Sequence, residues 1–401
     1  MLSERIKALR PSPTLALSAK AKAMAAEGKD VISLTVGEPD WDTFASAKKA
    51  GIQAIEMGKT KYAPTEGYPE LRRAIIDQTF KETGIKFEMY DVTVSAGGKF
   101  IIYSALQSIC NAGDEILIPA PYWVSYPDMV QLCEGKSKII VCGHDSGFKL
   151  TAELLEESIT RKTKLLIINS PSNPTGETYS ADELRELTNV LLKNPHVLVL
   201  TDDIYNRLYF EAPVAPHILQ VEPRLRDRVL VVSGVSKSYS MTGWRVGWAL
   251  GPKWWIDGMN VYQSQTVSCA ASISQMAAIE GIKNGEQEIP QAVASLKKRR
   301  DFFGQKLRSV SGLEFSMPTG AFYFWLDIRN FIGKSWQGKE ISGSQDFVKI
   351  LLEDFLVATV DGLSFGLEGY IRVSYAVNEK KLEEAVTRIA RFCSGISVAK
   401  A

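Results

Sequence analysis

The sequence predicts an α/β protein with a large, doubly wound and mostly parallel sheet domain, a smaller α+β domain and an N-terminal arm. Short apolar runs recur along the chain, and a polar loop and often a helical pattern follow each run. The runs are apolar at consecutive positions, which is typical of strands buried on both faces of a parallel sheet. With 401 residues, the chain is also long enough for a large domain and a smaller one.

Residues 1–45 are predicted to form the arm and the first part of the small domain. Residues 14–27 predict a helix that ends at Gly28, and the preceding Arg10-Pro-Ser-Pro segment favours extended backbone. Because such an arm has little core of its own, we expect it to pack against the small domain or against a partner subunit.

Residues 46–300 are predicted to form the large domain. The segments 101–109 and 181–192 carry apolar residues at three- and four-residue spacing, as helices that connect parallel strands do. The expected strands are 91–96, 115–119, 165–169, 197–201 and 229–233.

Residues 301–401 are predicted to form the small domain. The segments 316–326 and 370–375 favour strands, with helical stretches between and after them. We expect the last helix to begin after the capping residue Asn378.

Composition excludes several classes of function. The 47 Lys and Arg residues balance the 46 Asp and Glu residues, so neither nucleic acid nor an acidic membrane is an expected partner. The longest uncharged run, 258–279, is too polar to span a membrane, and no signal peptide is evident, so we expect a cytoplasmic protein. The five cysteines and three histidines show no metal-binding or disulfide spacing, so we expect no metal.

A phosphate site is suggested where the first of these strands ends. Gly97-Gly98-Lys99 follows it and opens a helix, which places free backbone N–H groups at a positive helix end. A simple tight turn is the commoner explanation for two such glycines. Nucleotide sites are disfavoured, because the chain lacks a complete P-loop motif and no GxGxxG opens a helix.

Further polar residues follow the other strands and belong at the same sheet edge. Asn173 lies in a stiff Pro/Gly loop, Asp202 and Tyr205 follow the next strand, and Lys237 follows the last one, with Arg245 eight residues later. Each residue also has an ordinary structural explanation when it is considered alone. The Asn173 loop is explained by a turn, Asp202 by a helix cap, Lys237 by a surface position and Arg245 by a structural ion pair. Together, an amine nucleophile, a carboxylate, an aromatic ring and a phosphate cradle are the parts of a pyridoxal-phosphate site.

The segment 234–247, Gly-Val-Ser-Lys-Ser-Tyr-Ser-Met-Thr-Gly-Trp-Arg-Val-Gly, resembles the attachment-site signature of class I pyridoxal-phosphate-dependent aminotransferases of fold type I. The resemblance runs along the whole chain and is strongest to bacterial aspartate and aspartate/prephenate aminotransferases. The other similar blocks are Val36-Gly37-Glu-Pro-Asp, Lys61-Tyr62-Ala-Pro-Thr-Glu-Gly, Pro121-Tyr-Trp123-Val-Ser-Tyr, Asn173-Pro-Thr-Gly, Gly320-Ala-Phe-Tyr and Ile371-Arg372-Val-Ser-Tyr.

The resemblance implies catalytic roles for Lys237, Asp202 and Tyr205. Lys237 would bind the cofactor covalently and move the substrate proton, and Asp202 would pair with the pyridine nitrogen. Tyr205 and Asn173 would hydrogen-bond the ring hydroxyl oxygen, and Trp123 would stack on the ring.

The resemblance also implies a phosphate site that two subunits share. Ser236, Arg245 and the Gly97-Gly98-Lys99 turn would hold the phosphate. Tyr62 would reach the phosphate bound by the neighbouring subunit, so a homodimer with shared active sites is expected.

For the substrate, the resemblance implies an amino acid and a 2-oxo acid. Arg372, Gly37 and Asn173 would bind the α-carboxylate beside Trp123. Lys99 and Thr14 match residues that contact a second, distal carboxylate, so acidic substrates such as aspartate and 2-oxoglutarate are expected, with prephenate left open.

The chain departs from close relatives at Phe44, Asp203 and Asp361, where those relatives usually have Pro, Glu and Pro. None of these changes removes a catalytic group. The change at Asp361 concerns the shape of the substrate pocket, so the resemblance does not fix the substrate specificity. An aromatic or kynurenine-type aminotransferase, a β-lyase and a cyclopropane-forming synthase would keep the same cofactor. A non-catalytic pyridoxal-phosphate-binding regulator is a remote alternative, because the arm is too short for a DNA-reading module.

Overall fold

A seven-stranded sheet lies at the centre of the larger part of the computed structural model, which describes residues 2–9 and 13–398. The strand order is β2-β8-β7-β6-β5-β3-β4, and β8 runs antiparallel to both of its neighbours while the other pairs are parallel. The strands are β2 (Val92–Ser95), β3 (Glu115–Ala120), β4 (Lys136–Val141), β5 (Thr163–Asn169), β6 (Leu198–Asp202), β7 (Val229–Gly234) and β8 (Gly247–Leu250).

This sheet confirms the predicted fold class and the five expected strands. Two further strands were not predicted. Strand β4 lies at the sheet edge and is mostly exposed, so its sequence lacks the apolar run of a central strand. Strand β8 is fully buried but only four residues long, too short for its pattern to stand out.

Alternate residues of the central strands face opposite cores. Leu166 and Ile168 of β5 belong to one hydrophobic cluster, whereas Leu165 and Ile167 belong to another. Helices therefore cover both faces of the sheet, as the doubly wound class requires. The helices of this part are α3 (Ala45–Glu56), α4 (Pro69–Thr83), α5 (Gly98–Ile109), α6 (Ser125–Leu132), α7 (Ala152–Ser158), α8 (Ala181–Lys193), α9 (Ile218–Val221) and α10 (Lys253–Ser264).

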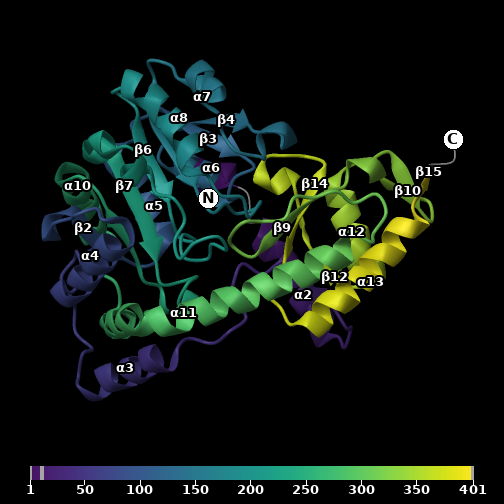
Figure 1. The fold of residues 1–401 in the computed structure, drawn as a ribbon, viewed down its shortest axis with the longest axis horizontal. Coiled ribbons are helices and arrows are strands. Elements are labelled where there is room, and N and C mark those ends of the chain that lie inside the picture. Colours follow the sequence, from purple (N-terminus) through teal and green to yellow (C-terminus); the bar gives the residue numbers. More distant parts are fainter. Residues whose placement is uncertain (1, 10–12, 399–401) are drawn as a thin grey trace.

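The long helix α11 (Ser272–Leu307) connects the two parts of the molecule (Figure 1). It packs on α3 and α4 of the larger part and on α13 (Glu379–Gly395) of the smaller part. The predicted boundary at residue 300 falls within this helix, and the division into domains stays a prediction.

The smaller part contains an antiparallel sheet with the order β13-β14-β9. The predicted cap is confirmed, because the Asn378 side chain accepts a hydrogen bond from the Lys381 N–H at 2.9 Å. The elements of this part are β9 (Tyr323–Asp327), β10 (Lys334–Trp336), β11 (Lys339–Ile341), α12 (Ser344–Phe355), β12 (Val357–Ala358), β13 (Val360–Asp361), β14 (Tyr370–Ser374), α13 and β15 (Ser397–Val398).

The N-terminal segment joins the smaller part. Strand β1 (Ile32–Ser33) pairs in parallel with β12, and Ala21 and Met24 of helix α2 (Pro13–Ala26) pack against Leu352. The helix expected over 14–27 is thus confirmed, as is its packing against the small domain, while residues 10–12 of the expected arm lie outside the described residues. Helix α1 is Glu4–Ala8. None of the helices described is long and apolar enough to cross a membrane.

Candidate active site

A cavity of about 680 Å³ opens where the parallel strands end, between the two parts of the molecule. Its wall includes Asp202 at the end of β6, Lys237 after β7 and Arg372 on β14. Three distant segments of the chain therefore meet at one site. The predicted residues that line it are Gly37, Gly98, Lys99, Trp123, Asn173, Asp202, Tyr205, Ser236, Lys237, Arg245 and Arg372.

Lys237 presents an amine that is enclosed by the site. Its Nζ donates a hydrogen bond to the Gly37 carbonyl oxygen and lies 5.9 Å from the centre of the Tyr205 ring. Burial lowers the pKa of Lys237 to about 8; the charge of Glu38 opposes this shift, and the nearby Arg372 adds to it. A sizeable fraction of the amine is therefore neutral at mildly alkaline pH, as a nucleophile or general base requires.

Asp202 is a buried carboxylate aimed into the cavity. Its Oδ2 accepts a hydrogen bond from the Tyr126 hydroxyl at 2.7 Å, and its backbone carbonyl accepts one from the Asn169 side chain at 2.8 Å. Burial raises the pKa of Asp202 to about 6, and the Tyr126 hydrogen bond acts in the opposite direction. A buried carboxylate of this kind can pair with a cationic group in the cavity.

Tyr205 follows Asp202 in the chain and lies on the same wall. Its hydroxyl is 2.9 Å from the Tyr323 hydroxyl of β9. A Cβ placed on Gly37 would lie 3.1 Å from that same Tyr323 oxygen, so a glycine allows the two segments to approach closely. Both tyrosines line the cavity that also contains the Lys237 amine.

Arg372 is a buried cation held by neutral groups. Its Nη1 donates to the Asn173 side-chain oxygen at 2.9 Å, and its Nη2 donates to the Thr35 carbonyl at 2.6 Å. Its buried Nε has no hydrogen-bond partner, and within residues 2–9 and 13–398 no carboxylate pairs with it. Burial lowers its pKa. A buried guanidinium without an anion is a strong site for a carboxylate ligand.

Another part of the cavity wall can hold an anion such as a phosphate. Gly97 precedes the first turn of α5 with a φ of +88°, and a Cβ there would lie 2.6 Å from a guanidinium nitrogen of Arg245. Only glycine fits this position. The free N–H groups of α5, Ser236 and Arg245 therefore form a cradle for an anion.

Lys99 and Trp123 lie together at the cavity rim. The Lys99 Nζ is 5.0 Å from the centre of the Trp123 ring, a favourable cation–π contact. Partial burial of the ammonium and the charge of Arg245 lower its pKa, whereas Asp128 raises it. Both residues line the cavity, as predicted.

Two predicted residues are not placed in the site. Tyr62 follows α3 and is 91% exposed, outside the cavity wall. Thr14 lies in α2, but its side chain is outside the described residues. From the same helix, Ser18 and Lys22 do line the cavity.

Tyr126, Tyr323 and Asn169 contact the predicted residues, although no role was assigned to them from the sequence. Tyr126 lies three residues after Trp123, which precedes α6, and the centres of the two rings are 5.3 Å apart. That spacing was the available signal. The pairing of Tyr323 with Tyr205 depends on how the two parts pack, which the sequence does not display.

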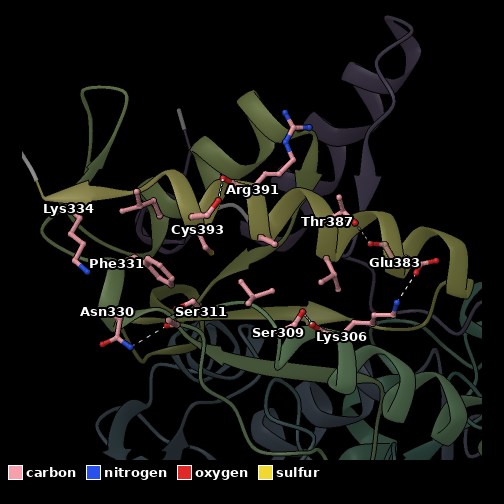
Figure 2. Close-up of a pocket in the computed structure, with 16 residues that line it drawn as sticks. Lys306, Ser309, Ser311, Asn330, Phe331, Lys334, Glu383, Thr387, Arg391 and Cys393 are labelled. Carbon is pink, nitrogen blue, oxygen red and sulfur yellow. Dashed lines mark hydrogen bonds and ion pairs between the residues drawn. The ribbon is translucent and has the colours of Figure 1, made fainter.

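A second cavity, of about 790 Å³, lies in the smaller part between α13 and the end of α11 (Figure 2). Lys306 and Glu383 pair across one end of it at 2.8 Å, and Lys334 lies at the other end. It shares no lining residue with the first cavity. We therefore assign the chemistry to the cavity that contains Lys237.

The fold and this site define a class of enzyme. Residues 29–389 match the family described as aminotransferase class I and II, and the chain belongs to that family. It is therefore an aminotransferase, a conclusion that the resemblance of its sequence motifs predicted.

The similar proteins narrow the class further. The chain is 46% identical to a probable aspartate/prephenate aminotransferase of Rickettsia felis, over 99% of this chain and 98% of that protein. It is similar to the crystal structure of the aspartate aminotransferase from Rhizobium meliloti, with a TM-score of 0.95 and 43% identity over 99% of this chain and 100% of that one. The aspartate aminotransferase of Thermus thermophilus, solved with maleate, has a TM-score of 0.92 and 34% identity over 98% and 99% of the two chains.

Proposed function

We propose that the chain is a pyridoxal-phosphate-dependent aminotransferase that moves the amino group of L-aspartate, or another acidic amino acid, to a 2-oxo acid such as 2-oxoglutarate. One observation carries the proposal: the buried Arg372, which lacks an anionic partner within the described chain, lines the same cavity as the amine of Lys237. The first binds a carboxylate and the second handles a proton, which are the two tasks that an amino-acid substrate presents.

The residues present fit pyridoxal phosphate. The Gly97 turn leaves room for the Arg245 guanidinium at the phosphate cradle, the buried Asp202 can pair with a protonated ring nitrogen, and Lys237 can bind the aldehyde covalently. Tyr205 and Asn173 would hold the ring oxygen and Trp123 the ring face. When bound, the cofactor supplies an aldehyde carbon that accepts amino groups and a ring that withdraws electrons from it.

The residues of the chain perform the remaining steps. Arg372 and Asn173 hold the substrate α-carboxylate, which fixes the orientation of its Cα in the cavity. The neutral Nζ of Lys237 then takes the proton from that Cα, because its lowered pKa makes it a free base at mildly alkaline pH. Asp202 remains ionised and keeps a proton on the ring nitrogen.

A second carboxylate on the substrate would lie near Lys99. The pKa of Lys99 is lowered first by partial burial and then by the charge of Arg245, so an anion placed there relieves the repulsion between the two cations. The Thermus thermophilus enzyme was solved with maleate, a dicarboxylate. These observations support an acidic substrate, with Thr14 as a second contact and prephenate as a further candidate acceptor.

We also propose that two copies of the chain share their active sites. Large apolar side chains on and after α3 are exposed, namely Ile52, Ile55 and Met57. An exposed apolar surface of this kind is typical of a subunit interface. Tyr62 lies beside it, 91% exposed, and would reach the phosphate of the partner subunit. A cytoplasmic location stays a prediction.

An absorbance scan tests this proposal. The protein is loaded with pyridoxal phosphate and mixed with single amino acids, without any oxo acid. Aspartate and glutamate should convert the visible band to that of the amine form of the cofactor, and 2-oxoglutarate should restore it. Conversion by phenylalanine or kynurenine alone would favour the aromatic alternative. Release of pyruvate from a substrate with a β-leaving group, without conversion, would favour a β-lyase.

A further inference from the structure

A second buried carboxylate, Asp203, lies directly behind Asp202. Asp202 is the last residue of β6 and lines the active-site cavity, whereas Asp203, the next residue, lines a separate cavity of about 30 Å³. The Asp203 Oδ1 accepts a hydrogen bond from the Thr201 hydroxyl, and its backbone N–H donates to the Val232 carbonyl at 2.8 Å. The mechanism described above does not use this carboxylate.

His217 contacts Asp203 through a defined nitrogen. The Leu219 N–H donates to the His217 Nδ1 at 3.1 Å, so Nδ1 carries no proton and the neutral ring carries its proton on Nε2. That Nε2 lies 3.3 Å from the Asp203 Oδ2, close but not aligned as a good hydrogen bond. Both side chains are buried, with 5% and 9% exposure. The ring therefore presents an N–H to the carboxylate.

The charge of this pair depends on Asp203. Burial lowers the pKa of His217 to about 4, so the ring is neutral near pH 7. Burial raises the pKa of Asp203 to about 7, with the Thr201 hydrogen bond opposing the shift. The negative charge of Asp203 in turn raises the pKa of Asp202.

The other charged groups around the small cavity are paired with one another. Arg207 forms an ion pair with Glu82 of α4 at 3.0 Å and donates a hydrogen bond to the Tyr239 hydroxyl at 2.8 Å. It also lies 3.4 Å from Glu286 of α11. Lys81 also pairs with Glu286, at 2.6 Å, so two cations face two carboxylates in this group. The group that faces the Asp203 Oδ2 is the His217 Nε2.

We infer that His217 and Asp203 form a positioning pair that sets the basicity of Asp202, and through it the hold on the ring nitrogen of pyridoxal phosphate; this inference rests on the proposed function. The anionic form of Asp203 makes Asp202 a stronger base and strengthens its pairing with a protonated ring nitrogen. The His217 N–H favours that anionic form.

The test measures the affinity of the apoenzyme for pyridoxal phosphate between pH 5.5 and 8.5. His217→Asn keeps a side-chain oxygen to cap α9, since Asn is a good cap, but is too short to reach Asp203. Asp203→Asn keeps the shape and removes the charge. His196→Asn is the matched control, because His196 is exposed and contacts the Thr160 carbonyl instead.

In the wild type and the control, the affinity for pyridoxal phosphate should rise in a step as the pH increases through about 7. Asp203→Asn should show no such step. In His217→Asn the step should move to higher pH, because the anion loses the N–H group that faces it. An unmoved step in His217→Asn, even with a lowered Tm, would mean a purely structural role and would overturn the inference. Persistence of the step in Asp203→Asn would overturn the inference as well. If His217→Asn does not fold, the result with Asp203→Asn alone tests the inference.

The ¹⁵N resonances of the imidazoles in the apoenzyme separate this inference from the proposed function. The His217 Nε2 resonance should follow the titration of Asp203 in the wild type and become independent of pH in Asp203→Asn. Failure of both wild type and control to bind pyridoxal phosphate would contradict the proposed function, whereas the resonances would still report the pair. A His217 ring protonated on Nδ1 would contradict the pair itself.

Discussion

The Nη1 of Arg372 lies 2.9 Å from the side-chain oxygen of Asn173, although the two residues are 199 positions apart in the chain. This contact joins β14 of the smaller part to the loop after β5 of the larger part, directly at the cavity. It also fixes the amide of Asn173, because its oxygen accepts from the guanidinium and its NH₂ group remains available to a ligand. We propose that an α-carboxylate binds at this pair.

Replacing Arg372 tests that assignment. Arg372→Lys keeps the charge but loses the planar fork, so kcat/KM for aspartate should fall by about a hundredfold, mainly through KM. Arg329→Lys, which alters a guanidinium paired with Asp327 outside the cavity, is the control and should change little. Steady-state kinetics of the two variants test this prediction. Equal kcat/KM values for both variants would contradict the assignment of Arg372 to the substrate site.

The lowered pKa of Lys237 predicts how cofactor uptake depends on pH. Its neutral amine is the reactive form, so the rate at which the apoenzyme takes up pyridoxal phosphate should rise with pH, with a midpoint of about 8. Stopped-flow absorbance measures this rate. A midpoint near 10.5, the ordinary value for lysine, would show that the amine is not enclosed as described.

Tyr62 should act across a subunit interface. Mixing Lys237→Ala chains with Tyr62→Phe chains produces hybrid dimers in which one site carries both defects and the other carries neither. After random reassortment, activity should return to about a quarter of the wild-type value. Activity no higher than the average of the two parent variants would indicate that each site is built from one chain.

Lys99 should determine the preference for acidic substrates. Lys99→Ala removes the ammonium at the cavity rim, and kcat/KM for aspartate and glutamate should fall by about ten- to a hundredfold. Alanine and phenylalanine, which lack a second carboxylate, should lose far less. Equal losses for acidic and neutral donors would mean that Lys99 serves only the phosphate, and the assignment of an acidic substrate would lose its support.

The part of the site that follows the parallel strands could be predicted from the sequence. Asp202 and Lys237 come directly after apolar runs, and the carboxyl ends of parallel strands converge at one edge, so their proximity follows from topology. The phosphate turn at Gly97 was predictable for the same reason.

Contacts that depend on how the parts pack could not be predicted from the pattern. The hydroxyl pair of Tyr205 and Tyr323 joins segments 118 residues apart, and Tyr126 reaches Asp202 from a helix on another strand connection. Tyr62 would contact the active site of a second copy of the chain, and the sequence of one chain does not display that contact. The His217 contact with Asp203 was missed because neither residue carries a pattern of its own in the sequence.

Covalent attachment at Lys237 is the central claim, and chemical reduction tests it most directly. Protein loaded with pyridoxal phosphate is treated with borohydride, which makes the link between lysine and cofactor permanent, and is then digested and mapped by mass spectrometry. The account predicts the pyridoxyl label on Lys237, and none in that peptide for Lys237→Ala. A label mainly on Lys99, Lys22 or another lysine, or no label at all, would contradict it.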